Sequence, residues 1–145
     1  MFIYYHNNGA ANYNPDVMAY NVRIQSNFPT LLKSNQTGVV KGTISWTDSS
    51  AKNTESVWDT AYMHAKSDVS LMYVPNSAVL HNGSSESEYS TNGVILSSEG
   101  LFGNGAMIAY DSRAWGVILG CNDYAGYVVC RIKVEEMGDE MGEEP

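Results

Sequence analysis

Two short patterns place residue types at spacings that suggest chemistry. Residues 100–105 have the sequence GLFGNG and contain Gly-x-Gly, but Ile108 stands where a dinucleotide-binding fingerprint needs its third glycine. Residues 49–52 have the sequence SSAK and match the Ser-x-x-Lys pattern of serine acyl enzymes, yet the companion Ser-Asp-Asn and Lys-Thr-Gly elements are missing. The first pattern therefore indicates a glycine-rich loop between strands, and the second is expected to be a chance match.

The histidines offer no further chemistry. His6, His64 and His81 are spread along the chain without the spacing of metal ligands, and no carboxylate stands at a diagnostic offset from any of them. Asp59 and His64 would meet only by accident of strand register. We therefore expect no catalytic residue, no metal site and no cofactor, and the chain is predicted not to be an enzyme.

Aromatic side chains are the other candidates for a site, because the chain has three tryptophans and ten tyrosines. Such side chains form sugar-stacking surfaces and protein-binding hot spots. Trp46 and Trp115 lie within apolar alternating runs, which predicts that they pack in the core. The candidates for exposed contacts are Trp58, Tyr89, Tyr124 and Tyr127.

The two cysteines, Cys121 and Cys130, flank a turn-rich stretch at 122–126. A hairpin centred between residues 125 and 126 would place them opposite one another, whereas a centre one or two residues earlier would separate them. We expect free, buried thiols that act as small apolar residues.

Two-residue alternation of apolar and polar side chains dominates the chain and predicts strands. Asn-Gly, which favours tight hairpin turns, occurs four times. Short strands at this spacing predict a mainly β fold, an antiparallel β-sandwich or barrel with at most one short helix. The expected strands cover residues 2–5, 17–24, 39–46, 69–74, 77–80 and 94–96, followed by a meander of 106–110, 114–119 and 127–134.

Residues 54–66 fit two patterns. Val57, Trp58, Ala61, Tyr62 and Ala65 recur at helical intervals after a suitable helix start at Thr54, and we expect a helix here. The alternative is a strand with Trp58, Thr60, Tyr62 and His64 on one face.

The first 38 residues are predicted to form an extended arm with a lone strand, which partners would order by strand addition. The alternative is that this segment folds back as edge strands of its own domain. Residues 39–134 are then the β domain. The expected partner-binding residues of the arm are Phe2, Tyr4, Met18, Tyr20, Val22 and Ile24.

Charge is concentrated at the C-terminus. Six of the 16 acidic residues lie in 135–145 without a Lys or Arg, so the ten other acids and eight bases give residues 1–134 a net charge of −2. We expect 135–145 to be a solvated, flexible tail, with a docking peptide for a basic surface as the alternative. The bases are scattered singly, so nucleic acid is not an expected partner. No apolar run approaches the ~20 residues that span a bilayer, so no membrane association is expected.

The chain is small and β-rich, has 17% charged residues, and abounds in Gly, Tyr, Asn and Ser. In these respects it resembles virion surface proteins of tailed bacteriophages, such as head decoration (cement) proteins or tail-associated β modules. The resemblance implies a virion protein, assembled in the host cytoplasm, that binds the major capsid protein lattice and stabilises the head. It also implies a homo-oligomer, with a trimer favoured. The alternative is a glycan- or receptor-binding β-sandwich module of a phage tail or cell surface.

Overall fold

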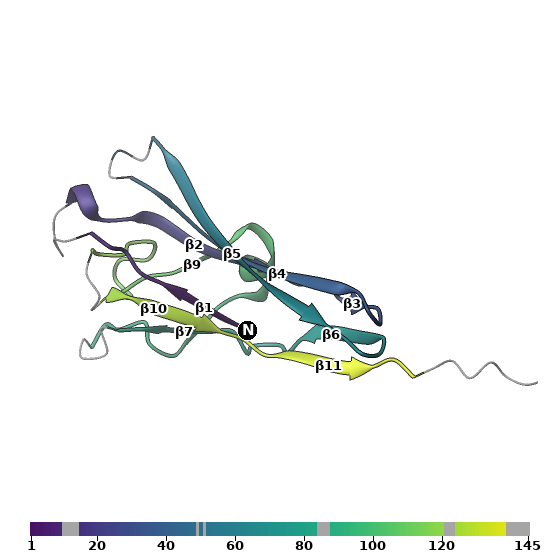
Figure 1. The fold of residues 1–145 in the computed structure, drawn as a ribbon. Helices are drawn as coiled ribbons and strands as arrows, with labels where there is room; N and C mark the ends of the chain where they lie inside the picture. Colours follow the sequence, from purple (N-terminus) through teal and green to yellow (C-terminus); the bar gives the residue numbers. More distant parts are fainter. Residues whose placement is uncertain (10–14, 49, 51, 84–87, 121–123, 139–145) are drawn as a thin grey trace, which may run out of the picture.

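Three antiparallel sheets build this protein in the computed structural model, which describes residues 1–9, 15–48, 50, 52–83, 88–120 and 124–138. The sheet β5-β4-β2-β9 faces the sheet β1-β10-β7-β8, and the small sheet β11-β6-β3 lies at one end, where β10 leads on into β11 (Figure 1). The strands are β1 (Phe2–Tyr5), β2 (Tyr20–Asn27), β3 (Leu31–Leu32), β4 (Thr37–Thr47), β5 (Thr54–His64), β6 (Val69–Tyr73), β7 (Val79–Asn82), β8 (Val94–Ile95), β9 (Ala106–Met107), β10 (Gly126–Val129) and β11 (Ile132–Glu136).

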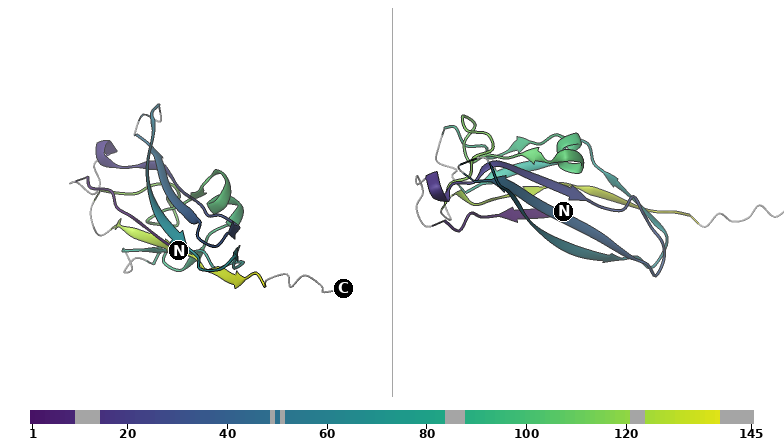
Figure 2. Two further views of the ribbon diagram at one scale, coloured as in Figure 1. Left: turned by 45° about the vertical axis from the view of Figure 1, so that its right-hand side comes forward. Right: turned by 90° about the horizontal axis from the view of Figure 1, so that it is seen from above.

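The core lies between the two larger sheets. Ile24 of β2, Leu80 of β7 and Val128 of β10 are buried there, together with Leu101 of the short π-helix η2 (Gly100–Asn104) and Ile108. The other helical element is the 3-10 turn η1 (Pro15–Val17). The prediction of a mainly β, antiparallel fold is confirmed, and the described strands form an open sandwich, not a closed barrel (Figure 2).

The N-terminal segment folds back into its own domain, which is the second of the two arrangements considered for it. β1 pairs with β10, and β2 lies between β4 and β9 in the middle of its sheet. Apolar alternation along β2 turns Val22 and Ile24 inward, and their exposed fractions are 3% and 0%. Residues 1–38 and 39–134 therefore share one hydrophobic core.

Residues 54–64 form strand β5, so the expectation of a helix is wrong. β5 pairs with β4 over eleven residues without a register shift, from Thr37↔His64 to Thr47↔Thr54. Pairing with a long regular partner outweighs the high helix propensity of Ala61 and Met63, because propensity contributes little energy compared with tertiary context. The alternative strand pattern holds, because Trp58, Thr60 and Tyr62 share one face of β5.

The last third of the chain differs from the expected meander. β9 is only two residues long and pairs with β2, whereas residues 114–119 contribute one isolated bridge, Ala19↔Ile118. Residues 118–120 of this connection are nevertheless buried, whereas Trp115, which was expected in the core, is 42% exposed. An apolar run therefore packs here as irregular chain, which periodicity alone does not distinguish from a strand.

The acidic segment starts inside a strand. Glu135 and Glu136 of β11 pair with Ser70 and Val69 of β6, and the Met137 N–H donates to the Asp68 carbonyl at 2.9 Å. The expectation of a tail from residue 135 is therefore wrong at its first residues, and residues 139–145 lie outside the described part. Cys130 is a buried free thiol and burial raises its pKa, while Cys121 lies outside the described residues.

Candidate functional site

An apolar groove with a volume of about 700 Å³ opens along the side of the sandwich where the two layers part. One wall comes from β1 and β11, which contribute Ile3 and Ile132, and the other from β4 and β5, which contribute Ile44 and Met63. Asp59 is the single charged side chain among the described residues that line it. The groove exists because β1 and β5 are the edge strands of their sheets and do not pair with each other.

Strand β5 is exposed on both faces. Val57 and Ala61 lie on the groove face opposite Ile44 and Val40, whereas Trp58 and Tyr62 lie on the outer face with exposed fractions of 63% and 66%. Large apolar side chains on a solvent-exposed edge strand are a binding or association surface unless something covers them.

Trp58, one of the predicted surface contacts, makes a cation–π contact with a lysine. Lys41 on β4 places its Nζ 4.6 Å from the centre of the Trp58 ring. This contact covers one face of the ring and leaves most of the side chain in solvent, so Trp58 is positioned but not buried.

An aromatic ladder crosses the outer face of β1, β10 and β7. Tyr127 stacks on Phe2 with ring centres 4.9 Å apart and on His81 at the same distance. Tyr4 lies directly opposite Tyr127 in register, and its ring meets His6 edge-on. Phe2 and Tyr4 are exposed, as expected for contact residues, but their neighbours cover both faces of the Tyr127 ring. The ladder therefore offers ring edges, which suit a protein surface better than the flat face of a sugar.

The other four residues assigned to the arm do not form a joint surface. Val22 and Ile24 lie in the core, so they cannot dock on a partner, because the amphipathic pattern that suggested docking is satisfied within the chain. Met18 and Tyr20 are half-buried, and the Tyr20 hydroxyl donates to the Met18 sulfur at 3.3 Å. Of the six arm residues, only Phe2 and Tyr4 of β1 are more than half exposed.

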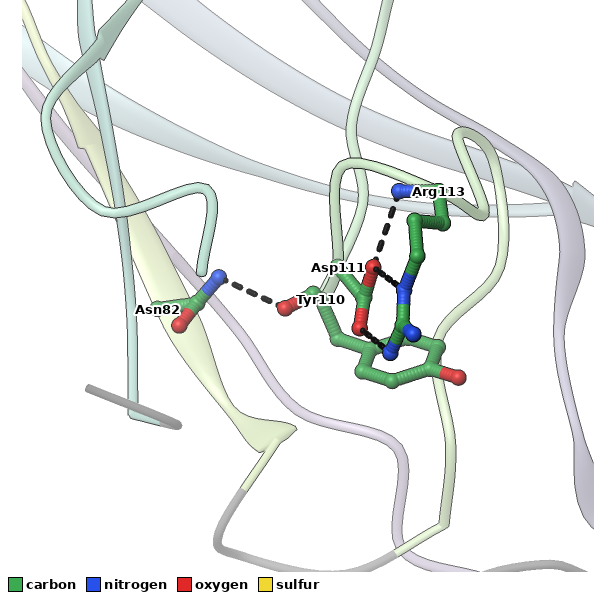
Figure 3. Close-up of polar contacts among 4 residues, drawn as sticks. All are labelled: Asn82, Tyr110, Asp111 and Arg113. Atoms are coloured by element: carbon green, nitrogen blue, oxygen red, sulfur yellow. Dashed lines mark hydrogen bonds and ion pairs between the residues drawn. The ribbon is translucent and has the colours of Figure 1, made fainter. Parts of the chain in front are cut away.

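A polar cluster fixes the loops near residues 89–113 (Figure 3). The buried carboxylate of Asp111 accepts three hydrogen bonds from Arg113: from its backbone N–H at 2.8 Å, its Nε at 3.1 Å and its Nη2 at 2.8 Å. The Arg113 guanidinium also stacks 3.6 Å from the centre of the Tyr89 ring. To one side of this pair, the Asn82 side-chain amide donates to the Tyr110 carbonyl at 3.0 Å (Figure 3).

This cluster has a structural role in the loops and is not an acid–base site. The side-chain hydrogen bond from Arg113 holds the pKa of Asp111 below its usual range, and the backbone bond adds to this effect against the opposing effect of burial. A carboxylate so fully hydrogen-bonded is a poor proton acceptor at neutral pH. Tyr89 and Tyr124, two predicted surface contacts, belong to this region, with Tyr124 packed edge-on against Tyr110 at 5.3 Å.

The remaining chemical candidates stay apart in space. His64 lies beside the Thr37 hydroxyl at 3.3 Å, and His81 beside the Asn92 amide oxygen at 2.7 Å. Within the described residues, no three His, Cys, Asp or Glu side chains gather as metal ligands. Residues 100–104 form η2, packed against β2. Ser49 of the SSAK pattern lies outside the described residues.

Three members of the exposed edge, Val57, Tyr62 and Met63, are not among the surface contacts predicted from the sequence. The signal was the alternation along residues 54–64, which distributes Val57, Asp59, Ala61 and Met63 to one face. Helical spacing of the same residues concealed it.

No protein-family model matches the chain, and no curated protein or solved structure shows significant similarity to it. In the part of the chain that the structure describes, no helix is long and apolar enough to cross a bilayer.

Proposed function

We propose that this chain is a non-enzymatic structural protein of a virion, a decoration protein that binds the lattice of the major capsid protein and stabilises the head. The observation that carries the proposal is the open apolar groove between β1 and β5. Exposed apolar grooves mark places where another protein docks. A protein whose work is assembly needs such a surface and needs no catalytic group.

The groove suits an extended apolar segment of a partner. Its walls are Ile3, Ile44, Met63 and Ile132, and the outer edge of β1 is unpaired among the described residues. A partner segment lying beside β1 would form backbone hydrogen bonds with it and place alternate side chains in the groove. The aromatic ladder of Phe2 and Tyr127 next to this edge would add contact area.

The glycan-binding alternative has less support. Stacking on sugars needs an open ring face, and both faces of Tyr127 are covered by Phe2 and His81. Arg113 covers one face of Tyr89. Trp58 keeps one ring face open, so the sugar alternative would rest on this single side chain.

Two measurements test the proposal: whether the protein is part of purified particles, and whether its binding to them depends on the groove. Particles purified from the native source should carry the chain in a fixed ratio to their shell protein, measured by quantitative mass spectrometry. Ile132→Asp, which places a charge in the groove wall, should abolish rebinding to particles stripped of the protein, whereas Ile95→Asp, at an exposed isoleucine of β8 outside the groove, should rebind normally. Absence from purified particles, or normal rebinding of a folded Ile132→Asp variant, would refute the proposal.

A further inference from the structure

The outer edge of β5 has no partner among the described residues, and the strand is eleven residues long. Protected edge strands in other proteins are short or carry lysine, proline, bulges or other charged residues, and of these devices β5 has only the acidic side chains of Glu55 and Asp59. We propose that two copies of this chain pair through β5, antiparallel and about a two-fold axis at Thr60, so that their sheets join into one. This inference does not depend on the virion role.

The free backbone groups of β5 belong to its even-numbered residues. The Asp48 N–H donates to the Asn53 carbonyl at 3.3 Å, and the Asn35 N–H donates to the Ala65 carbonyl at 3.1 Å. Residues 53 and 65 therefore direct their backbone groups toward β4, and alternation gives the same direction to the odd residues between them. The N–H and C=O groups of residues 54, 56, 58, 60, 62 and 64 consequently form one row that faces away from the sheet.

Side chains select the register of this pairing. With the axis at Thr60, Trp58 lies opposite Tyr62 of the partner subunit, and Val57 lies opposite Met63 of the partner subunit. Aromatic and apolar cross-strand pairs of this kind stabilise sheets. On both faces of β5 the exposed side chains would thus gain apolar neighbours across the new strand pair, aromatic rings on the outer face and aliphatic side chains on the groove face.

Charge disfavours a two-fold axis moved by one residue to Asp59, which shifts the register by two residues. An axis at Asp59 would place two Asp59 carboxylates directly opposite each other, which destabilises a strand pair. With the axis at Thr60, each Asp59 instead lies opposite Ala61 of the partner subunit. An axis at Trp58 would face Asp59 with Val57 and leave Tyr62 opposite Thr54, so it would lose both favourable pairs.

One local contact competes with the pairing. The Thr60 N–H donates to the Asp59 carboxylate at 2.8 Å, and this exposed hydrogen bond covers the backbone donor at the proposed axis. It also confirms that the Thr60 N–H faces away from β4. Pairing must replace this bond with a hydrogen bond between the two strands, so Asp59 weakly opposes self-association through β5.

The first experiment compares Thr60→Pro with Thr60→Ala in the full chain, using sedimentation equilibrium at micromolar concentrations. Proline removes the outward N–H without removing a bond to β4, which edge strands tolerate. Wild type and Thr60→Ala should sediment at about twice 15.9 kDa, and Thr60→Pro at 15.9 kDa with an unchanged circular dichroism spectrum. A wild-type mass of one or three chains, or a folded Thr60→Pro variant that remains a dimer, would overturn the pairing.

The second experiment measures the register and does not depend on proline. Directly opposite residues in an antiparallel pair have Cα atoms close enough for a disulfide. Under mild oxidation Thr60→Cys should form a covalent dimer in high yield, whereas Ser56→Cys should behave like wild type, because Ser56 lies opposite His64 of the partner subunit. Cross-linking that is strongest for Trp58→Cys or Asp59→Cys would reject the Thr60 axis.

Discussion

The ring of Tyr5 in β1 lies directly over Gly126 of β10, its partner in strand register. A Cβ atom at Gly126 would collide with the Tyr5 hydroxyl and ring and with the His81 carbonyl. Tyr5 is 4% exposed, so this glycine provides the space in which the N-terminal strand packs against its own sheet. The fit explains why β1 belongs to the domain and is not a free arm.

Gly126→Ala should therefore destabilise the protein. Overpacking of a dense site that cannot relax costs about 1–3 kcal/mol, to be measured by urea unfolding. The matched control is Gly42→Ala, also in a strand, where the added Cβ would meet the flexible Ile3 side chain at 3.4 Å, an ordinary contact distance. Equal stability of the Gly126→Ala variant and wild type would contradict the close approach of Tyr5.

Tyr5→Phe should leave stability unchanged or raise it by about 1 kcal/mol at neutral pH, because the buried hydroxyl has no hydrogen-bond partner among the described residues. Burial also raises the pKa of Tyr5. An unfolded tyrosine ionises near pH ~10, so above that pH the unfolded chain loses a proton that the folded chain keeps. Wild type should then lose more stability than Tyr5→Phe between about pH 8 and 10.5. Tyr4→Phe, in the same strand but exposed, should follow the wild-type curve.

Asp111→Asn should lower the thermal midpoint at pH 7 by a few degrees, since it removes the ion pair that holds Arg113 and the loop around it. The pKa of Asp111 is lowered in the folded state, so its stabilisation is present above the unfolded value near pH ~4 and is lost as the pH falls below it. The difference in thermal midpoint between Asp111→Asn and wild type should therefore be smaller in strong acid than at pH 7. If this difference is the same in strong acid and at pH 7, the carboxylate charge does not stabilise the loop.

Local pattern predicted the fold class but not which segments cover one another. The structure has the amphipathic strand that the alternation along β2 predicted. The apolar face of β2 packs in the core of its own domain, where Ile24 joins Leu80 and Val128. Residues 54–64 have both helical and strand periodicity, and only the eleven-residue ladder with β4 decides between them. The groove depends on two edge strands, β1 and β5, that are far apart in sequence, so no local signal reveals it.

The acidic end of the chain allows a test by truncation. Deleting residues 139–145 should leave the thermal midpoint unchanged if this acidic sequence is solvated as expected, because like charges contribute little favourable energy. Deleting 135–145 should lower it, because the pairs of Glu135 with Ser70 and Glu136 with Val69 and the Met137 hydrogen bond are lost together. Equal midpoints for the two truncations would show that this end of β11 contributes nothing to stability.

Removing the Asp59 carboxylate, which opposes strand pairing at the β5 edge, should strengthen self-association. Asp59→Ala frees the Thr60 N–H and removes two carboxylates that the Thr60 axis would place diagonally across the pair. The dimer dissociation constant, measured by sedimentation equilibrium, should fall about three- to tenfold, and the effect should be largest at low ionic strength, where charge repulsion is least screened. Glu55→Ala is the matched control, because it removes an exposed carboxylate near the end of the same strand, which the Thr60 axis places opposite Ala65 of the partner subunit. Weaker association of Asp59→Ala would mean that this side chain supports the contact, and the two-fold axis at Thr60 would have to be abandoned.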